Sequence, residues 1–205
     1  MKTQFDPHIA DPLKVKKLEK EFENTISELN KQKYISIMEE RKRLNKILMS
    51  YKIAKPIEIV WPKLLSILLK DLHPSLKIEN VNKGDFYITS NSKDKLPFRI
   101  KNYDDQKTIT IEWISKKQWF TRTINVKQIK NNSTKIFYMD ISKGEVSVAG
   151  YFERRVIFVY NKRQVIAFTI QMLNLKIDLE LVPSNKIEKI KNKIEKMLKY
   201  SQKLY

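Results

Sequence analysis

The sequence predicts an α+β protein in which an antiparallel sheet is followed by a long amphipathic helix. Two patterns lead to this prediction. Short runs of alternating apolar and polar residues fill 76–141, and apolar residues recur at a three-four spacing over 184–203. A third observation is the helical pattern of residues 57–72, which comes before the alternating runs. Helices on both sides of one block of strands are typical of the α+β class.

Composition indicates one globular core with an appendage, in a reducing compartment. The chain has 205 residues, of which 41% are hydrophobic and 10% aromatic. It contains no cysteine, which removes disulfides and thiolate chemistry together. No run is apolar enough for a signal peptide or a transmembrane segment. We therefore expect a cytoplasmic protein.

The charge of the chain is strongly positive, with 41 basic and 23 acidic residues and a net charge of +18. Such a balance can indicate nucleic acid or anionic lipid as a partner. However, nearly all of the charge is lysine, whereas bidentate recognition of phosphates and bases favours arginine. A solvated lysine surface and a dedicated binding surface both remain open at this point.

Residues 1–46 are predicted to form an N-terminal helical extension, with a helix over 11–46. Asp11 can cap its start, and Pro12 suits the first helical position. Apolar residues then follow at a three-four spacing as far as Leu29, with charged residues between them. The helix either packs on its own domain, which we favour, or acts as an arm for a protein partner or for self-association.

The remainder, 47–205, is predicted to be one domain that starts with a strand at 47–53 and a helix at 57–72. Alternation and turn residues then predict a meander of strands. The predicted strands are 76–81, 85–90, 97–103, 108–114, 119–129 and 134–141. Segment 142–182 is unusual. Residues 174–182 alternate like a strand, while the part before them suits either a hairpin or a buried helix.

A strand, a helix, an antiparallel meander and a long C-terminal helix, in this order, resemble the helix-grip fold of the START-like (SRPBCC) superfamily. The sequence motif of the resemblance is the segment AKPIEIVWPKLL. The residues that carry the resemblance are Pro56, Val60, Trp61, Leu64 and Leu65. The short uncharacterised bacterial domains of that superfamily are the most similar. The resemblance implies a curved sheet that wraps the C-terminal helix, and a cavity between sheet and helix for an apolar or lipid-like ligand. It gives Trp61 a structural role. The predicted cavity-lining residues are Trp113, Phe137, Ile190, Ile194 and Met197.

Catalytic constellations are not recognisable in the sequence. The two histidines, His8 and His73, lie far apart, and only three glycines occur. These residues give no usual zinc site, no phosphate-binding loop and no nucleophile-base pair. We therefore predict no enzymatic activity, no cofactor and no metal.

One local feature favours a second function, because the segment 115–135 combines basic residues with Trp119 and Phe120 and contains no acid. Basic residues beside aromatic ones suit RNA or an anionic surface. The predicted basic surface consists of Lys116, Lys117, Arg122, Lys127, Lys130, Lys189, Lys193 and Lys196. The main hypothesis is a non-enzymatic ligand-binding module. The alternatives are a basic adaptor for RNA, the ribosome or DNA, and an interaction scaffold that uses the N-terminal helix.

Overall fold

The computed structural model describes residues 6–31, 44–90, 95–115, 118–129, 132–144 and 150–204, and of residues 150–157 the backbone alone. In chain order the elements are α1 (Pro12–Lys31), β1 (Leu44–Ile53), α3 (Ile57–Leu72), the 3-10 helix η1 (Ile78–Asn80), β2 (Phe86–Ile88), β3 (Pro97–Asp104), β4 (Thr108–Ser115), β5 (Gln118–Ile129), β6 (Ser133–Gly144), α4 (Gly150–Asp178) and α5 (Ser184–Gln202). The predicted α+β class is confirmed.

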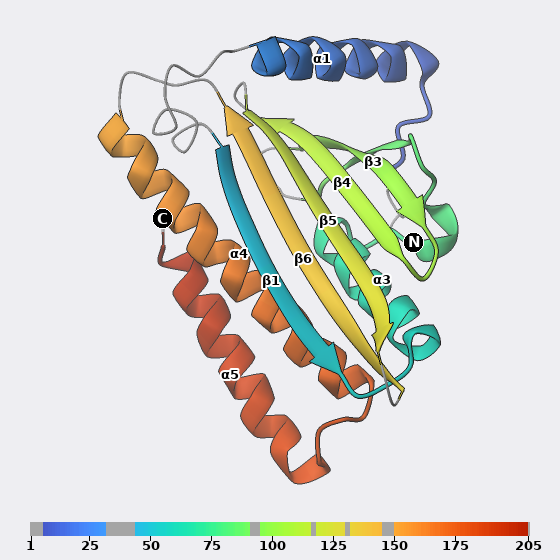
Figure 1. The fold of residues 1–205 in the computed structure, drawn as a ribbon, viewed down its shortest axis with the longest axis vertical. Coiled ribbons are helices and arrows are strands. Elements are labelled where there is room, and N and C mark those ends of the chain that lie inside the picture. The colour runs from blue at the N-terminus through green and yellow to red at the C-terminus, as the bar shows by residue number, and fades with distance from the viewer. Residues whose placement is uncertain are drawn as a thin grey trace, which may run out of the picture.

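The sheet is antiparallel and curved, with the strand order β1-β6-β5-β4-β3-β2 (Figure 1). Strands β2 to β6 follow one another as a meander, and β1 joins at the far edge by pairing with β6. The alternating runs at 47–53 and 85–141 all contain strands, as predicted. The run 76–81 is the exception and forms η1. Leu76 and Val81 are each 4% exposed, so its apolar residues cover one end of the core without a strand partner.

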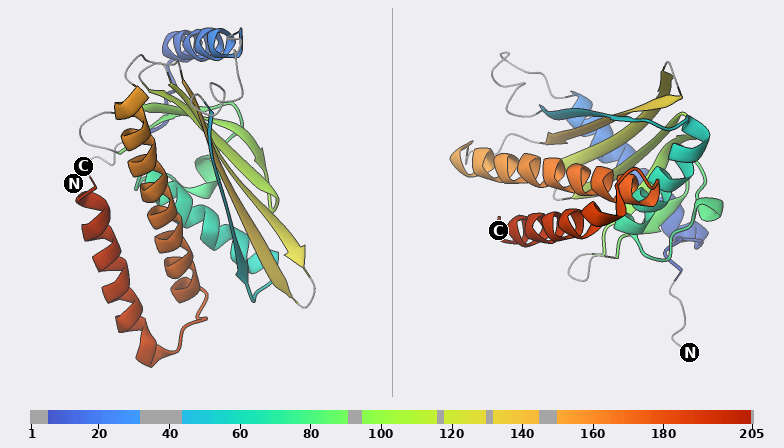
Figure 2. Two further views of the ribbon diagram at one scale, coloured as in Figure 1. Left: turned by 60° about the vertical axis from the view of Figure 1, so that its left-hand side comes forward. Right: turned by 90° about the horizontal axis from the view of Figure 1, so that it is seen from below.

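The helix that the sheet grips is α4, which corrects the sequence prediction. The sequence predicts the C-terminal helix of 184–203 against the sheet, and it leaves the structure of 145–182 open, although residues 174–182 alternate like a strand. Instead α4 runs through Gly150–Asp178 along the concave face, and α5 lies on the outer side of α4 (Figure 2). Leu175 and Leu179, at 0% and 5% exposure, belong to the hydrophobic core, and both come from the segment that alternates like a strand.

The physical reason for this error is that α4 is buried on two opposite sides. Ile166 and Phe168 are two residues apart and therefore lie on opposite sides of the helix, yet they are only 8% and 5% exposed. Phe168 packs against the sheet through Tyr138. A helix covered on both sides has apolar residues around most of its circumference, so it lacks the one-sided period that marks a surface helix.

Helix α5 is attached to α4 by a partial apolar seam and by polar contacts. Ile194 is 9% exposed, while Leu198 and Tyr200 are exposed. The Arg163 guanidinium of α4 donates to the Ser201 carbonyl at 3.3 Å. The Lys162 ammonium of α4 lies 4.9 Å from the centre of the Tyr200 ring. Helix α5 is therefore a second layer over α4 and has no place in the grip itself.

Helix α1 packs on the convex face of the sheet, as we favoured. Phe22 is 1% exposed and meets Phe86 edge to face, and the Arg99 guanidinium lies over both rings. Arg99 is also paired with the buried Glu112. The predicted cap is present, because the Leu13 amide donates to Asp11. Of the rest of the predicted helix 11–46, residues 32–43 lie outside the described residues, and β1 already begins at Leu44. The domain division at 46 stays a prediction.

The placement of α4 can be tested by comparing two leucines in the two C-terminal helices. We expect Leu175→Ala to lower the free energy of unfolding by about 2–5 kcal/mol, because it empties a fully buried site between helix and sheet. Leu198→Ala, on the exposed side of α5, should cost less than about 0.5 kcal/mol. Urea denaturation followed by circular dichroism measures both. Equal costs would mean that α5 is as deeply packed as α4.

Candidate functional site

The concave face of the sheet differs between its two ends. The end that carries the β3–β4 and β5–β6 turns lies lower in Figure 1. Toward that end, Ile109, Ile124 and Ile136 are 0–1% exposed and belong to one hydrophobic core with α3 and α4. At the upper end, near the turn between β4 and β5, the inward side chains Trp113 and Phe120 are only half-buried. We call this region the upper grip. A ligand that enters between sheet and helix would meet this end first.

A buried ion pair lies at the centre of the upper grip. Asp140 of β6 is fully buried, and the Arg122 guanidinium of β5 donates to its Oδ2 from Nε at 3.2 Å and from Nη2 at 3.0 Å. The two residues are directly paired across β5 and β6, which places both side chains on the concave face. Because desolvation of two charges is costly, such a pair depends on further hydrogen bonds.

Side chains from α4 and β6 supply those hydrogen bonds. The Tyr160 hydroxyl donates to Oδ1 of Asp140 at 2.7 Å, and the Tyr138 hydroxyl lies 3.1 Å from Oδ2. Gln164 accepts from Nη2 of Arg122 through its side-chain oxygen. Tyr160 and Gln164 are four residues apart on α4 and therefore share one face of the helix. We call these five residues, Arg122, Tyr138, Asp140, Tyr160 and Gln164, the Arg122 cluster.

Aromatic rings line the cluster on the side of the β4–β5 turn. The rings of Trp113 and Phe120 are parallel, with centroids 5.2 Å apart, and Phe120 also lies 5.6 Å from the Tyr160 ring. The Arg122 guanidinium lies 5.3 Å from the centre of the Trp113 ring. The upper grip therefore combines flat apolar surfaces with one polar cluster, which is the composition of small-molecule sites in general.

The protonation states in the cluster are set by burial and by the ion pair. Burial raises the pKa of Tyr138 and of Tyr160, and the negative charge of Asp140 raises both further. Burial alone would lower the pKa of Arg122, but interactions with Tyr138, Asp140 and Tyr160 outweigh it and raise that pKa. Both phenols are therefore neutral donors at neutral pH, and Arg122 is charged. The charges of Arg122 and Asp140 cancel, so the cluster carries no net charge.

Of the predicted cavity-lining residues, the structure brings only Trp113 to the concave face. Phe137 points the other way, because it precedes the inward-facing Tyr138 by one residue, and it is 37% exposed with Lys135 over its ring. Ile190, Ile194 and Met197 belong to α5, which α4 separates from the sheet. These four residues cannot line a cavity between sheet and helix.

The predicted basic surface is divided by the structure. Arg122 does not belong to it, since its side chain is 15% exposed and paired with Asp140. Lys127 is exposed on β5. Lys116, Lys117 and Lys130 lie outside the described residues. The three lysines of α5 come together in one place, described next.

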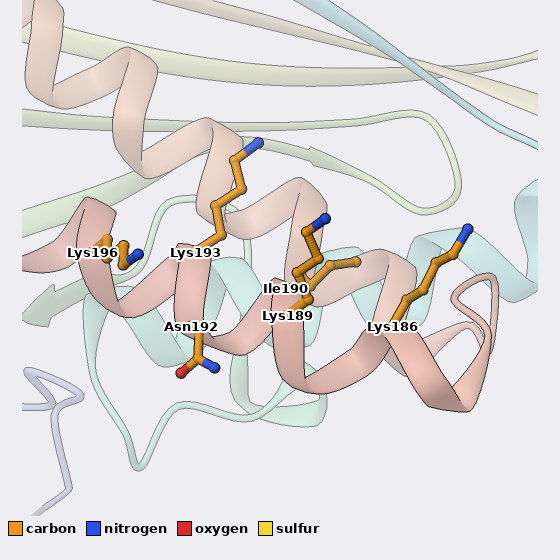
Figure 3. Close-up of a pocket in the computed structure, with 6 residues that line it drawn as sticks. All are labelled: Lys186, Lys189, Ile190, Asn192, Lys193 and Lys196. Carbon is orange, nitrogen blue, oxygen red and sulfur yellow. The ribbon is translucent and has the colours of Figure 1, made fainter.

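A groove of about 950 Å³ follows one flank of α5 (Figure 3). It is lined by Lys186, Lys189, Ile190, Asn192, Lys193 and Lys196. The acids of this helix, Glu188 and Glu195, are not among these lining residues, and Glu195 pairs instead with Lys199 at 2.7 Å. If the basic-adaptor alternative applies to this chain, this groove is where the described lysines concentrate.

Sequence reasoning missed most of the Arg122 cluster. The sequence predicts only a strand at Asp140, and it leaves open the structure of the segment that contains Tyr160 and Gln164. One signal was available: Asp140 and Tyr138 occupy alternate positions of the strand that is predicted at 134–141, so a carboxylate and a phenol share one face of that strand. A buried carboxylate needs a cationic partner, and Arg122 is the arginine of the neighbouring predicted strand.

Comparisons with known proteins find distant structural similarities alone. No family model matches the sequence, and no curated protein matches it. Among solved structures, CalU16 from Micromonospora echinospora is similar over 74% of this chain and 84% of its own, with 12% identity and a TM-score of 0.46. The Zhui aromatase/cyclase from Streptomyces sp. R1128 matches over 69% and 98%, with 11% identity and a TM-score of 0.47. Norcoclaurine synthase from Thalictrum flavum matches over 50% and 77%, with 15% identity and a TM-score of 0.36.

The chain has the helix-grip fold of START-like proteins, so the resemblance is confirmed at the level of fold. The strand order, with a helix between β1 and β2 and a long helix after β6, carries this assignment. Two of the similar structures are named as enzymes, a cyclase and a synthase. The prediction of no enzymatic activity rested only on missing motifs, and it does not stand for a chain with this fold. Within the described residues, no helix is long and apolar enough to cross a membrane.

Proposed function

We propose that this chain binds an apolar small molecule in the upper grip, between the concave face of the sheet and the N-terminal half of α4. One observation carries the proposal: on β5 and β6 the buried core extends only as far as Ile124 and Tyr138, and beyond Arg122 the inward rings of Phe120 and its strand neighbour Trp113 are only partly buried. Burial of apolar surface is worth on the order of 25 cal/mol per Å², so the part of the Trp113 ring that is still exposed would gain from contact with an apolar ligand. Partial exposure at the end of a gripped helix therefore favours an occupant.

The chemistry of the lining also supports an apolar occupant. The parallel rings of Trp113 and Phe120 provide a flat apolar wall, and Tyr160 continues it from the helix side. The helix-grip fold commonly holds hydrophobic ligands, which agrees with this location. The proposal replaces the earlier set of lining residues, of which only Trp113 remains.

The test is a variant that fills the upper grip. Ser142 continues the inward alternation of β6 above Asp140 and is paired with Phe120, so Ser142→Trp places a large ring in the proposed site. We expect it to weaken binding of the neutral apolar dye N-phenyl-1-naphthylamine by about tenfold or more, which corresponds to ~1.4 kcal/mol. Dye fluorescence, titrated with protein, measures the affinity.

Ser50→Trp is the matched control. Ser50 is exposed on β1, opposite the outward-facing Phe137 on the convex face, so the same substitution there should leave dye binding unchanged. If the wild-type protein fails to bind the dye, or if both variants bind it as well as the wild type, the upper grip is not an apolar site.

A further inference from the structure

Two hydrogen-bond donors of the Arg122 cluster have no acceptor within the described part of the chain. Nε and Nη2 of Arg122 donate to Asp140, and Nη2 also to Gln164, which leaves Nη1. An arginine nitrogen can only donate, so Gln164 must present its oxygen to Arg122, and its amide nitrogen is left as well. These two unused donors belong to side chains that are joined by a hydrogen bond, so they lie in the same part of the site.

The position of these donors makes their lack of acceptors significant. The Arg122 side chain is 15% exposed and is covered by the rings of Trp113 and Tyr138. Polar groups this deeply buried normally have a partner in the protein, in ordered water or in a ligand. The acceptors of the cluster, by contrast, are well used: Asp140 receives hydrogen bonds at both of its oxygens. The site thus has donors to offer to a ligand, and those donors lie beside the aromatic wall.

The charge balance of the cluster decides what kind of acceptor fits. The positive charge of Arg122 is already matched by Asp140 at 3.0 Å, and the phenols of Tyr138 and Tyr160 are neutral. A ligand carboxylate would add an unbalanced negative charge to a largely desolvated site, which is costly. A neutral carbonyl oxygen accepts the same hydrogen bonds without that cost.

We infer that the ligand of the upper grip is an apolar, ring-containing molecule with a neutral carbonyl group, whose oxygen accepts hydrogen bonds from Nη1 of Arg122 and from the Gln164 amide. Its ring lies along Trp113 and Phe120. This inference rests on the proposed function, because it names the ligand class for the same site. A ketone, an ester and an amide share this chemistry.

Three naphthalenes of similar size test the acceptor. 2-Ethylnaphthalene has none, 2-acetylnaphthalene has a neutral carbonyl, and 2-naphthoate has a carboxylate. Affinities are measured by displacement of N-phenyl-1-naphthylamine from the full-length protein. We expect 2-acetylnaphthalene to bind about tenfold more tightly than either of the other two, since a hydrogen bond from a charged donor is worth about one decade or more in affinity.

Two conservative variants assign that preference to its donors. Arg122→Lys keeps the charge opposite Asp140 but lacks Nη1. Gln164→Glu keeps an oxygen for Arg122 but lacks the amide donor. Each should reduce the preference for 2-acetylnaphthalene over 2-ethylnaphthalene severalfold. Arg163→Lys is the matched control, because Arg163 bonds to α5 outside the grip, and it should leave the preference unchanged. Circular dichroism and the urea midpoint confirm that each variant is folded.

The outcomes separate this inference from the proposed function. If the dye and the naphthalenes all fail to bind, the proposed function falls. Equal affinities for the ethyl and acetyl compounds would overturn the carbonyl inference while the apolar site stands. So would tightest binding of 2-naphthoate, or a preference that persists in both Arg122→Lys and Gln164→Glu.

Discussion

Replacement of Asp140 by alanine is expected to lower the free energy of unfolding by about 3–5 kcal/mol. The substitution leaves the Arg122 guanidinium charged in a site where its side chain is 15% exposed, and it removes the acceptor of the Tyr160 hydroxyl. Arginine keeps its proton in proteins, so the unpaired charge is not relieved by loss of a proton. Urea denaturation, monitored by tryptophan fluorescence and circular dichroism, measures the loss.

The matched control for Asp140→Ala removes both charges together. A double variant, Arg122→Met with Asp140→Leu, keeps the volume and leaves no unpaired charge, so we expect it to be clearly more stable than Asp140→Ala, with a remaining loss of about 1–3 kcal/mol from the Tyr160 hydroxyl that has lost its acceptor. Tyr160→Phe removes one hydrogen bond and should cost only about 1 kcal/mol. A loss below about 1 kcal/mol in Asp140→Ala would contradict burial of the ion pair.

Replacement of Trp61 by alanine is the second substitution with a large expected effect, about 3–5 kcal/mol. Trp61 of α3 is 1% exposed and its ring stacks on Tyr103 with centroids 6.5 Å apart. Its indole nitrogen donates to Asp105 at 2.8 Å, in the turn between β3 and β4. This single side chain therefore connects α3 to the sheet, in agreement with the structural role that was predicted for it.

Two milder changes divide the effect of Trp61 into packing and hydrogen bonding. Trp61→Phe keeps an aromatic ring but loses the indole donor, and Asp105→Ala keeps the ring and leaves the donor unpaired. We expect each to cost about 1–3 kcal/mol, clearly less than Trp61→Ala. Chemical denaturation at fixed pH measures all three. A cost of Trp61→Ala no larger than that of Asp105→Ala would show that packing on the sheet contributes little.

Local patterns were sufficient for most of the sheet and for α3. The strands of 97–141 alternate between a buried face and a more exposed face, so their period of two is visible in the sequence. Helix α3 is covered on one side, which gives the stripe of Trp61, Leu64, Leu65 and Leu68. The predicted break between the strands 97–103 and 108–114 also agrees with the β3–β4 hairpin.

Which face of a strand points inward could not be fixed in the same way. Phe137 and Tyr138 are neighbours in β6 and both are aromatic, so either could have been the inward residue. The choice depends on the register with β5, where Tyr138 is opposite Ile124. A shift by one residue exchanges the two faces of a strand. The prediction from sequence assigned the wrong face of this strand to the interior, and Phe137 therefore does not belong to the site.

By itself the sequence determined the α+β class, the meander, the amphipathic character of α5 and the structural role of Trp61, because each depends on contacts that one face of one element makes. The tertiary structure alone decided which helix the sheet grips and which polar residues come together between that helix and the sheet. Helix α4 packs on both the sheet and α5, so its apolar residues are not confined to one side and show no helical period in the sequence. Arg122, Asp140 and Gln164 come from three elements, and their mutual distances depend on how those elements pack. The site exists only because these elements pack together, and in the sequence its residues look like those of an ordinary strand and helix.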